Sequence, residues 1–122
     1  MTTQVFVYGT LMPGQARWPA LAGYADPDRP PIRAHTWGLL YDTGWGWPAA
    51  VFGRGIDSWL IAGFVVALDP GREPQALAKL DEIEGVDHQL FQRIPASAGG
   101  SVCWAYHWPG HTDGFVAIEA WA

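Results

Sequence analysis

The sequence has little of what marks secreted, nucleic-acid-binding or membrane-spanning proteins. Its single cysteine, Cys103, cannot form an internal disulfide and so gives no indication of secretion. Only one of its seven basic residues is a lysine, twelve residues are acidic, and no cluster of Lys and Arg occurs, which makes nucleic acid a poor candidate partner. The longest apolar stretch, residues 59–68, is about half as long as a bilayer-spanning helix requires.

The amino-terminal residues also lack a secretory signal, because no basic segment is followed there by a long apolar run. Together these absences predict a cytoplasmic protein whose partners include no nucleic acid and no membrane. The chain of 122 residues fits one domain, and its 49% hydrophobic content argues against disorder, so we expect a single domain over residues 1–122. Fifteen glycines and ten prolines are scattered without a period, which excludes collagen-like and linker sequences.

Short apolar runs bounded by turn residues predict strands in most of the chain. The predicted strands are residues 4–8, 36–41, 48–52, 58–68, 90–96 and 102–108, with a last one within 112–122. The near-continuous apolar run of 58–68 predicts burial on both faces, 26–33 reads as a loop, and Gly99-Gly100 indicates a hairpin. Many strands and few helices predict an α+β fold with a compact barrel-like sheet.

Two helices are expected. A short one lies within residues 16–25, and the second covers 73–83, where apolar residues recur at spacings of three and four. We expect Asp69 to cap the start of the second helix and Gly85 to end it.

The first motif that carries chemistry, Tyr8-Gly9-Thr10-Leu11, follows the first predicted strand. A strand that ends at a glycine-containing turn exposes several backbone N–H groups together. Such a concave set of donors binds anions, including carboxylates. An ordinary strand-to-turn transition explains the same four residues, so the motif alone leaves both interpretations open.

The second motif is the acidic end of the second helix, residues 80–86 (LDEIEGV). Glu84 follows apolar Ile83 at a position where negative charge opposes the helix dipole, which is unfavourable unless the charge has a use. Partial burial by apolar neighbours would raise the pKa of Glu84 and suit it to general base catalysis; a solvated helix end is the alternative. We expect the other acids of this segment to lie in solvent: Asp81, Glu82 and Asp87.

Other possible sites are weaker. Cys103, His107 and His111 are spaced by four residues, but 102–108 is strand-like, and four residues along a strand separate side chains by roughly 13 Å. We therefore expect neither a zinc site nor a cysteine nucleophile, and no nucleotide fingerprint indicates a cofactor. Of the eight tryptophans, Trp45 and Trp47 lie in a predicted loop and are the candidates to face a ligand.

In combination the two motifs resemble those of the γ-glutamylcyclotransferase-like family, with its γ-glutamylamine cyclotransferase and AIG2-like branches. The resemblance covers most of the chain, through VFVYGTLMPGQ, WGLLYDTGWGWPAAVF, IAGFVVALD, ALAKLDEIEGV and FQRIPA in that order. It implies a small mixed β-barrel flanked by helices. It also implies a reaction in which the α-amine of a γ-glutamyl group attacks its own γ-carbonyl, releasing 5-oxoproline and an amine or amino acid, without metal or cofactor.

The resemblance also assigns roles to residues. Glu84 matches the family's catalytic glutamate, as base and acid, and the backbone of Tyr8, Gly9, Thr10 and Leu11 would hold the substrate's α-carboxylate, with the Thr10 hydroxyl available for a further hydrogen bond. The partner would be a small γ-glutamyl compound, and the chain a monomer or homodimer. A non-catalytic binding module with the same pocket is the alternative function.

This sequence departs from the family pattern at two places. Met12-Pro13 and Arg17 occupy positions where the family often has basic residues and an asparagine, and Phe91 stands where a tyrosine is common. Tyr106 is a candidate to replace that tyrosine in substrate binding, with a core aromatic as the alternative. These departures leave the leaving group of the substrate undetermined.

Overall fold

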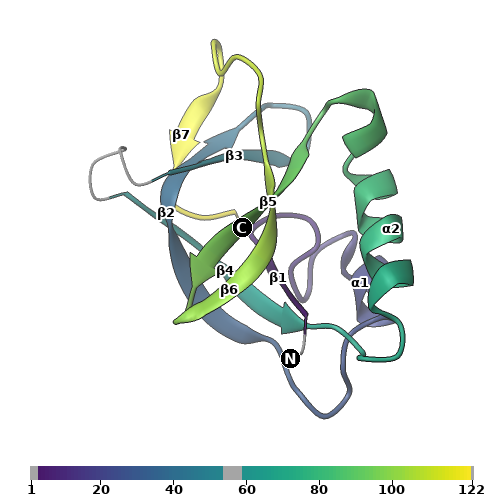
Figure 1. Ribbon diagram of the computed structural model, residues 1–122. Coiled ribbons are helices and arrows are strands. Elements are labelled where there is room, and N and C mark those ends of the chain that lie inside the picture. The colour runs from purple at the N-terminus through teal and green to yellow at the C-terminus, as the bar shows by residue number, and fades with distance from the viewer. Residues whose placement is uncertain (1–2, 54–58, 122) are drawn as a thin grey trace.

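One mixed sheet of seven strands organises the computed structural model, which describes residues 3–53 and 59–121 (Figure 1). The elements are β1 (Gln4–Val7), α1 (Trp18–Ala22), β2 (Ile32–Asp42), β3 (Pro48–Phe52), β4 (Leu60–Ala67), α2 (Glu73–Ile83), the 3-10 turn η1 (Val86–His88), β5 (Gln92–Ala98), β6 (Ser101–His107) and β7 (Val116–Ile118). The expected hairpin is present, since β5 and β6 pair up to Ala98 and Ser101 around Gly99-Gly100.

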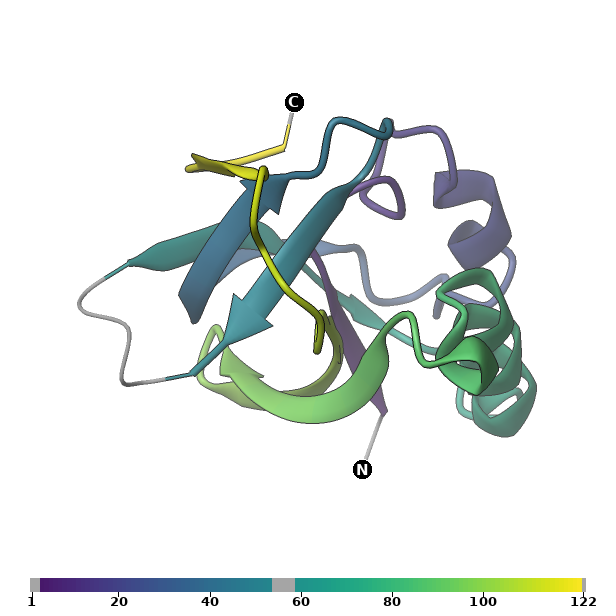
Figure 2. The same ribbon diagram turned by 90° about the horizontal axis from the view of Figure 1, so that it is seen from above.

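The sheet curls into a nearly closed barrel, which Figure 2 shows from above with the helices on one side. Its strand order is β3-β2-β4-β1-β6-β5, and β7 pairs with β2. Only the β1–β6 pair is parallel among the described strands. Hydrogen bonds join the two ends of this order: the Trp108 amide donates to the Ala50 carbonyl at 2.8 Å, and the Thr36 hydroxyl donates to the Ser97 carbonyl at 2.7 Å. The predicted α+β class with a barrel-like mixed sheet is confirmed.

β1 divides the hydrophobic core into two parts, because successive side chains of a strand point to opposite faces. Val5 and Val7 pack against the helices in one cluster, whereas Phe6 and Tyr8 belong to a second cluster built from the strands alone. The central strand therefore ends between the barrel and the helical side, and the chain leaves it at Gly9.

α2 occupies the residues predicted for it, and Gly85 ends it with the left-handed φ of 67° that favours glycine. The expectation that Asp69 caps this helix is wrong. Its carboxylate accepts a hydrogen bond from the Gly71 amide at 3.1 Å, closing a separate turn, so the helix starts only after Arg72. In the described parts of the chain, no helix is long and apolar enough to cross a membrane.

The predicted strand 58–68 is observed as β4, with Ser58 outside the described residues. Its burial on both faces holds only for the second half, since Val65 and Val66 are buried while Leu60 is 47% exposed. The first half of β4 pairs with β2 only, and its outward face meets solvent. β2 begins inside the predicted loop 26–33, because the pairing with β4 extends back to Ile32.

Candidate active site

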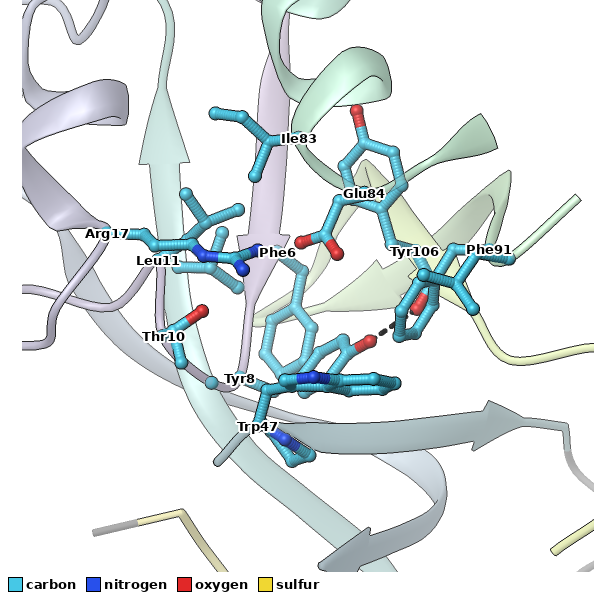
Figure 3. A pocket seen from close by; sticks show the side chains of 14 residues that line it. Phe6, Tyr8, Thr10, Leu11, Arg17, Trp47, Ile83, Glu84, Phe91 and Tyr106 are labelled. Carbon is cyan, nitrogen blue, oxygen red and sulfur yellow. Dashed lines mark hydrogen bonds between the residues drawn. The ribbon is translucent and has the colours of Figure 1, made fainter. Parts of the chain in front are cut away.

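A small cavity lies between the end of β1, the end of α2 and the segment before β3 (Figure 3). Its volume is about 90 Å³. It contains both motifs that the sequence singles out, although about seventy residues separate them. The lining residues are Phe6, Val7, Tyr8, Gly9, Thr10, Leu11, Arg17, Trp47, Pro48, Ile83, Glu84, Leu90, Phe91 and Tyr106.

Glu84 is held in place by the way α2 ends. Its amide still donates to the Leu80 carbonyl at 2.9 Å, and Gly85 then turns the chain so that the Leu90 amide donates back to the Gly85 carbonyl at 3.1 Å. The carboxylate points into the cavity (Figure 3). Burial raises the pKa of Glu84 to about 7, and the positive charge of Arg17 opposes part of that rise. A carboxylate with this pKa can both accept and return a proton near neutral pH.

Gly9, Thr10 and Leu11 line the same cavity. In the described residues, no turn or loop hydrogen bond uses any of their three amides as donor. The loop is fixed by its other groups, since the Met12 amide donates to the Gly9 carbonyl at 3.0 Å and the Arg17 amide to the Thr10 carbonyl at 2.8 Å. The loop is therefore held in one shape, while its three amides have no turn or loop acceptor among the described residues.

Position 9 has no room for a side chain. A Cβ built on Gly9 would lie 2.5 Å from the Pro48 Cγ, far inside van der Waals contact. The close approach of the β1 end to the first residue of β3 therefore requires glycine. It is this packing, rather than a left-handed φ, that explains the glycine of the motif.

Tyr8 and Tyr106 cross-link the floor of the site. The Tyr8 hydroxyl donates to the Tyr106 carbonyl at 2.6 Å, and the Tyr106 hydroxyl donates to the Asp81 carboxylate at 2.8 Å (Figure 3 draws the first bond). Burial raises the pKa of both phenols far above the usual value, so both stay protonated donors. Tyr106 is 2% exposed and also lines the cavity, so it is both a core aromatic and part of the pocket wall.

Asp81 corrects one expectation, because it is not a solvated residue. Its side chain is 26% exposed, it accepts the Tyr106 hydrogen bond, and its carboxylate lies 3.6 Å from the Arg93 Nε. These partners come from β5 and β6, which the helix sequence alone could not reveal. Glu82 and Asp87 are exposed, as expected.

Aromatic rings form the wall opposite Glu84. Trp47 lines the cavity and packs edge-on against Phe91, with 5.8 Å between ring centroids. Trp45 packs against Trp47 with the two rings tilted by 49°, but it is 62% exposed and does not line the cavity, so only one of the two predicted tryptophans does. Phe91 is buried there and brings no hydroxyl to the site.

Arg17 is a lining residue that the sequence indicated only as a departure from the family pattern. Its guanidinium and the Glu84 carboxylate point toward one another in Figure 3, although no ion pair within 4.0 Å joins them. It is the only basic residue among those that line the cavity in the described part of the chain. Its position eight residues after Gly9 did not indicate that it lines the cavity, because the fold of the intervening loop decides where the side chain points.

The cysteine and histidines that were set aside lie elsewhere. Cys103 is buried in the barrel cluster, and the His107 Nδ1 accepts a hydrogen bond from the Phe52 amide at 3.2 Å. Among residues 3–53 and 59–121, no three His, Cys, Asp or Glu side chains are grouped so that they could hold a metal ion.

Comparison with known proteins places the chain in a family. The profile described as gamma-glutamyl cyclotransferase, AIG2-like, matches residues 5–122. Among solved structures, an AIG2-like protein from Mus musculus is similar with a TM-score of 0.75 and 18% identity, covering 99% of this chain and 88% of that one.

Two further solved structures share the fold. An uncharacterized protein from Pyrococcus horikoshii has a TM-score of 0.69 and 20% identity, covering 96% of this chain and 86% of that one. YkqA from Bacillus subtilis has a TM-score of 0.68 and 24% identity, covering 99% of this chain and 40% of that one. No protein with a curated description matches the sequence.

Proposed function

We propose, since the chain belongs to the gamma-glutamyl cyclotransferase, AIG2-like family, that it converts a γ-glutamyl compound to 5-oxoproline with Glu84 as general base and acid. One observation carries the proposal. A partly buried carboxylate with a pKa of about 7 shares a small cavity with three backbone amides that no loop hydrogen bond occupies. Proton transfer and anion binding are the two tasks that this cyclisation requires.

The reaction balances without any other reactant. The Glu84 carboxylate takes a proton from the substrate's α-ammonium, and the freed amine attacks the γ-carbonyl carbon of the same glutamyl group. A new C–N bond closes the five-membered ring. Protonated Glu84 then gives its proton to the leaving nitrogen, and the carboxylate takes the extra proton that the ring nitrogen carries after the attack. The old C–N bond breaks, Glu84 passes this second proton to the freed amine, and 5-oxoproline and an ammonium product are released.

The cavity would supply proximity by holding the glutamyl group folded. In this proposal the amides of Gly9, Thr10 and Leu11 bind the α-carboxylate, and the Thr10 hydroxyl adds a donor. Tyr8 and Tyr106 form the floor under the folded substrate, because hydrogen bonds fix both rings. Tight placement of the amine and the carbonyl lowers the barrier of an intramolecular reaction that is slow in water.

Release of 5-oxoproline is the direct test. The purified chain is incubated with γ-glutamyl dipeptides and γ-glutamyl amines, and 5-oxoproline is measured by mass spectrometry. Glu84→Gln keeps the size of the side chain and removes the base, so kcat should fall by about 10²–10⁴-fold. Glu82→Gln is the matched control, because that side chain is 77% exposed and does not line the cavity. This variant should keep wild-type turnover.

The panel also separates the enzyme from a binding module. Phe91 gives the alternative its physical basis, since the wall of the cavity lacks a hydroxyl there. Saturable binding of γ-glutamyl compounds by calorimetry, with no 5-oxoproline from any of them, would establish the binding module. Wild-type turnover by the Glu84→Gln variant would instead remove Glu84 from the mechanism.

A further inference from the structure

A second and larger cavity lies at the opposite end of β1 from the candidate active site. Its volume is about 540 Å³, within the range of roughly 300–1,000 Å³ that small-molecule sites occupy. Figure 1 shows the start of β1 and the loop before β2 at the lower end of the barrel, whereas α2 ends at the upper side. The lining residues are Thr3, Gln4, Arg29, Pro95, Ser101, Val102, Cys103 and Trp104.

One wall of this second cavity is apolar and open to solvent. Pro95 and Trp104 are paired across β5 and β6, and Val102 lies two residues before Trp104 on the same face of the strand. The Arg93 guanidinium packs on the Trp104 ring, with 4.8 Å between its Cζ and the ring centroid, and so holds the ring in place. Val102 is 73% exposed and still has apolar surface to bury. An aromatic ring would bury that surface and pack against the tryptophan.

Two polar side chains of the lining have groups without a partner among the described residues. The Arg29 guanidinium donates no hydrogen bond there, and its Nε lies 3.9 Å from the Asp26 carboxylate, beyond hydrogen-bond distance. The Gln4 amide nitrogen donates to no described acceptor, and the contact of that side chain joins its Oε1 to the Cys103 Sγ at 3.9 Å. Both groups are therefore available to a ligand.

The charge of the second cavity favours an anion. Arg29 is the only charged residue among the described lining residues. Two acids contact the lining from outside it, Asp26 at Arg29 and Glu73 at the Thr3 hydroxyl. The net charge of −5 repels anions from the molecule as a whole, so a positive charge in a hollow that no described acid lines would select one locally. A guanidinium binds a carboxylate through two parallel N–H donors.

We propose that this cavity is a second binding site, which takes a small aromatic carboxylate. The ring of the ligand packs against Val102 and Trp104, its carboxylate binds the Arg29 guanidinium, and the Gln4 amide donates a further hydrogen bond. The inference does not depend on the proposed cyclisation, because the two cavities share no described lining residue. Gln4 and Tyr8, at the two ends of β1, are separated by roughly 13 Å along the strand.

An NMR titration of the full chain with phenylacetate tests the site. The ¹H–¹⁵N spectrum should show saturable shifts at the Trp104 indole N–H and the Val102 amide, with a Kd of about 1 mM, which suits a ligand of this size. The indole signal is assigned by its loss in Trp104→Phe. Phenylacetamide, which has the same shape without the charge, should bind about tenfold more weakly, and acetate, which lacks the ring, weaker still.

Variants separate the two parts of the recognition. Arg29→Gln should weaken phenylacetate binding about tenfold and leave phenylacetamide binding unchanged. Val102→Thr keeps the shape of the side chain and adds a hydroxyl, so it should weaken the binding of both ring compounds alike. Arg33→Gln is the control, because it removes an exposed positive charge that does not line this cavity and should change neither affinity.

Three outcomes would overturn the proposal. The first is the absence of saturable shifts at Trp104 and Val102 at phenylacetate concentrations of about 10 mM, where a site with the expected Kd is mostly filled. The second is equal affinity of the wild type for phenylacetate and phenylacetamide, which removes Arg29 from the recognition of a carboxylate. The third is a set of shifts confined to Gly9, Thr10 and Leu11, which would place the ligand in the candidate active site instead.

Discussion

Asp81 and Glu84 lie one helical turn apart at the end of α2, and the structure gives them opposite surroundings. Asp81 has polar partners on two strands, the Tyr106 hydroxyl and the Arg93 guanidinium. Glu84 has no hydrogen-bond or ion-pair partner among the described side chains, and burial raises its pKa to about 7. The same chemical group is thus a structural anchor at one position and a buried group with a raised pKa at the other.

The difference shows that the candidate site lowers the free energy of unfolding. A partnered carboxylate stabilises the barrel-to-helix contact, whereas a buried and unpartnered one costs free energy whenever it is charged. In the proposed mechanism, stability and function are therefore separated between two residues of one short segment. Changes at or near Asp81 and Glu84 should therefore affect stability and turnover differently.

The largest effect is expected from pH. If Glu84 must be ionised to take the α-ammonium proton, kcat/KM should fall about 50-fold from pH 7 to pH 5, with a slope that approaches tenfold per pH unit below about pH 6. Arg17→Gln should move the midpoint to higher pH, because Arg17 lowers the pKa of Glu84. Asp81→Asn should leave the midpoint near 7, and a midpoint that moved with Asp81 instead would reverse the two roles.

Next in size is the effect of adding a side chain at Gly9, which displaces the loop beside Glu84 and leaves the partners of Asp81 in place. A Cβ in Gly9→Ala would lie 2.5 Å from Pro48, so the loop that carries the three amides must move. We expect a drop of about 10- to 100-fold in kcat/KM, since misplacement of about 1 Å has effects of that order. Gly23→Ala is the control, because a Cβ there meets nothing within 4 Å and the φ of −66° suits alanine.

Unchanged kinetics in Gly9→Ala would mean that the amides of this loop do not hold the substrate. The crystal structure of the variant would then show whether Pro48 had moved instead. Either way, the stability of Gly23→Ala, measured by urea denaturation, should equal or slightly exceed that of the wild type.

Local rules were enough to place Glu84 at a helix end and Tyr8-Gly9-Thr10-Leu11 at a strand end. Gly85 fixes the helix end just after Glu84, and the run of residues 4–7 followed by Gly9 fixes the end of β1. The periodicity of α2 placed that helix on the residues that it occupies. What remained was one tertiary step, and the resemblance to a known family supplied it.

The partners of Asp81 could not be predicted because they depend on tertiary pairing. Arg93 and Tyr106 reach Asp81 only because β5 and β6 pair with each other and pack beside α2. The direction of Arg17 depends likewise on the hydrogen bond of its amide to Thr10, which no local pattern reports. Sequence rules therefore singled out Glu84 and missed the tertiary contacts of Asp81 and the direction of Arg17.

Stability should change in opposite directions when the two acids are removed. The folded-state pKa of Glu84 is raised from 4.5 to about 7, so the folded protein binds more protons than the unfolded chain between these values, and stability falls as pH rises through that window. Glu84→Gln removes this loss and should raise the free energy of unfolding at pH 8 by about 1–3 kcal/mol, allowing for partial solvent exposure. Asp81→Ala should lower it by about 1–3 kcal/mol, because Arg93 and Tyr106 lose their partner.

Urea denaturation at pH 5 and pH 8 checks both signs. The gain in Glu84→Gln should be largest at pH 8 and small at pH 5, where the wild-type carboxyl is already mostly protonated in the folded state. A loss of stability at pH 8 in this variant would show that the Glu84 charge has a partner that offsets its burial.

The smallest effect concerns the single hydrogen bond from Tyr106 to Asp81. A double-mutant cycle with Asp81→Ala and Tyr106→Phe should give a coupling energy of about 1 kcal/mol in the free energy of unfolding. Tyr8→Phe in place of Tyr106→Phe should couple weakly to Asp81, because the Tyr8 hydroxyl donates to a backbone carbonyl instead. A coupling near zero for Tyr106 would make Asp81 the solvated helix-end residue that its sequence context predicts, and the contrast with Glu84 would then rest on burial alone.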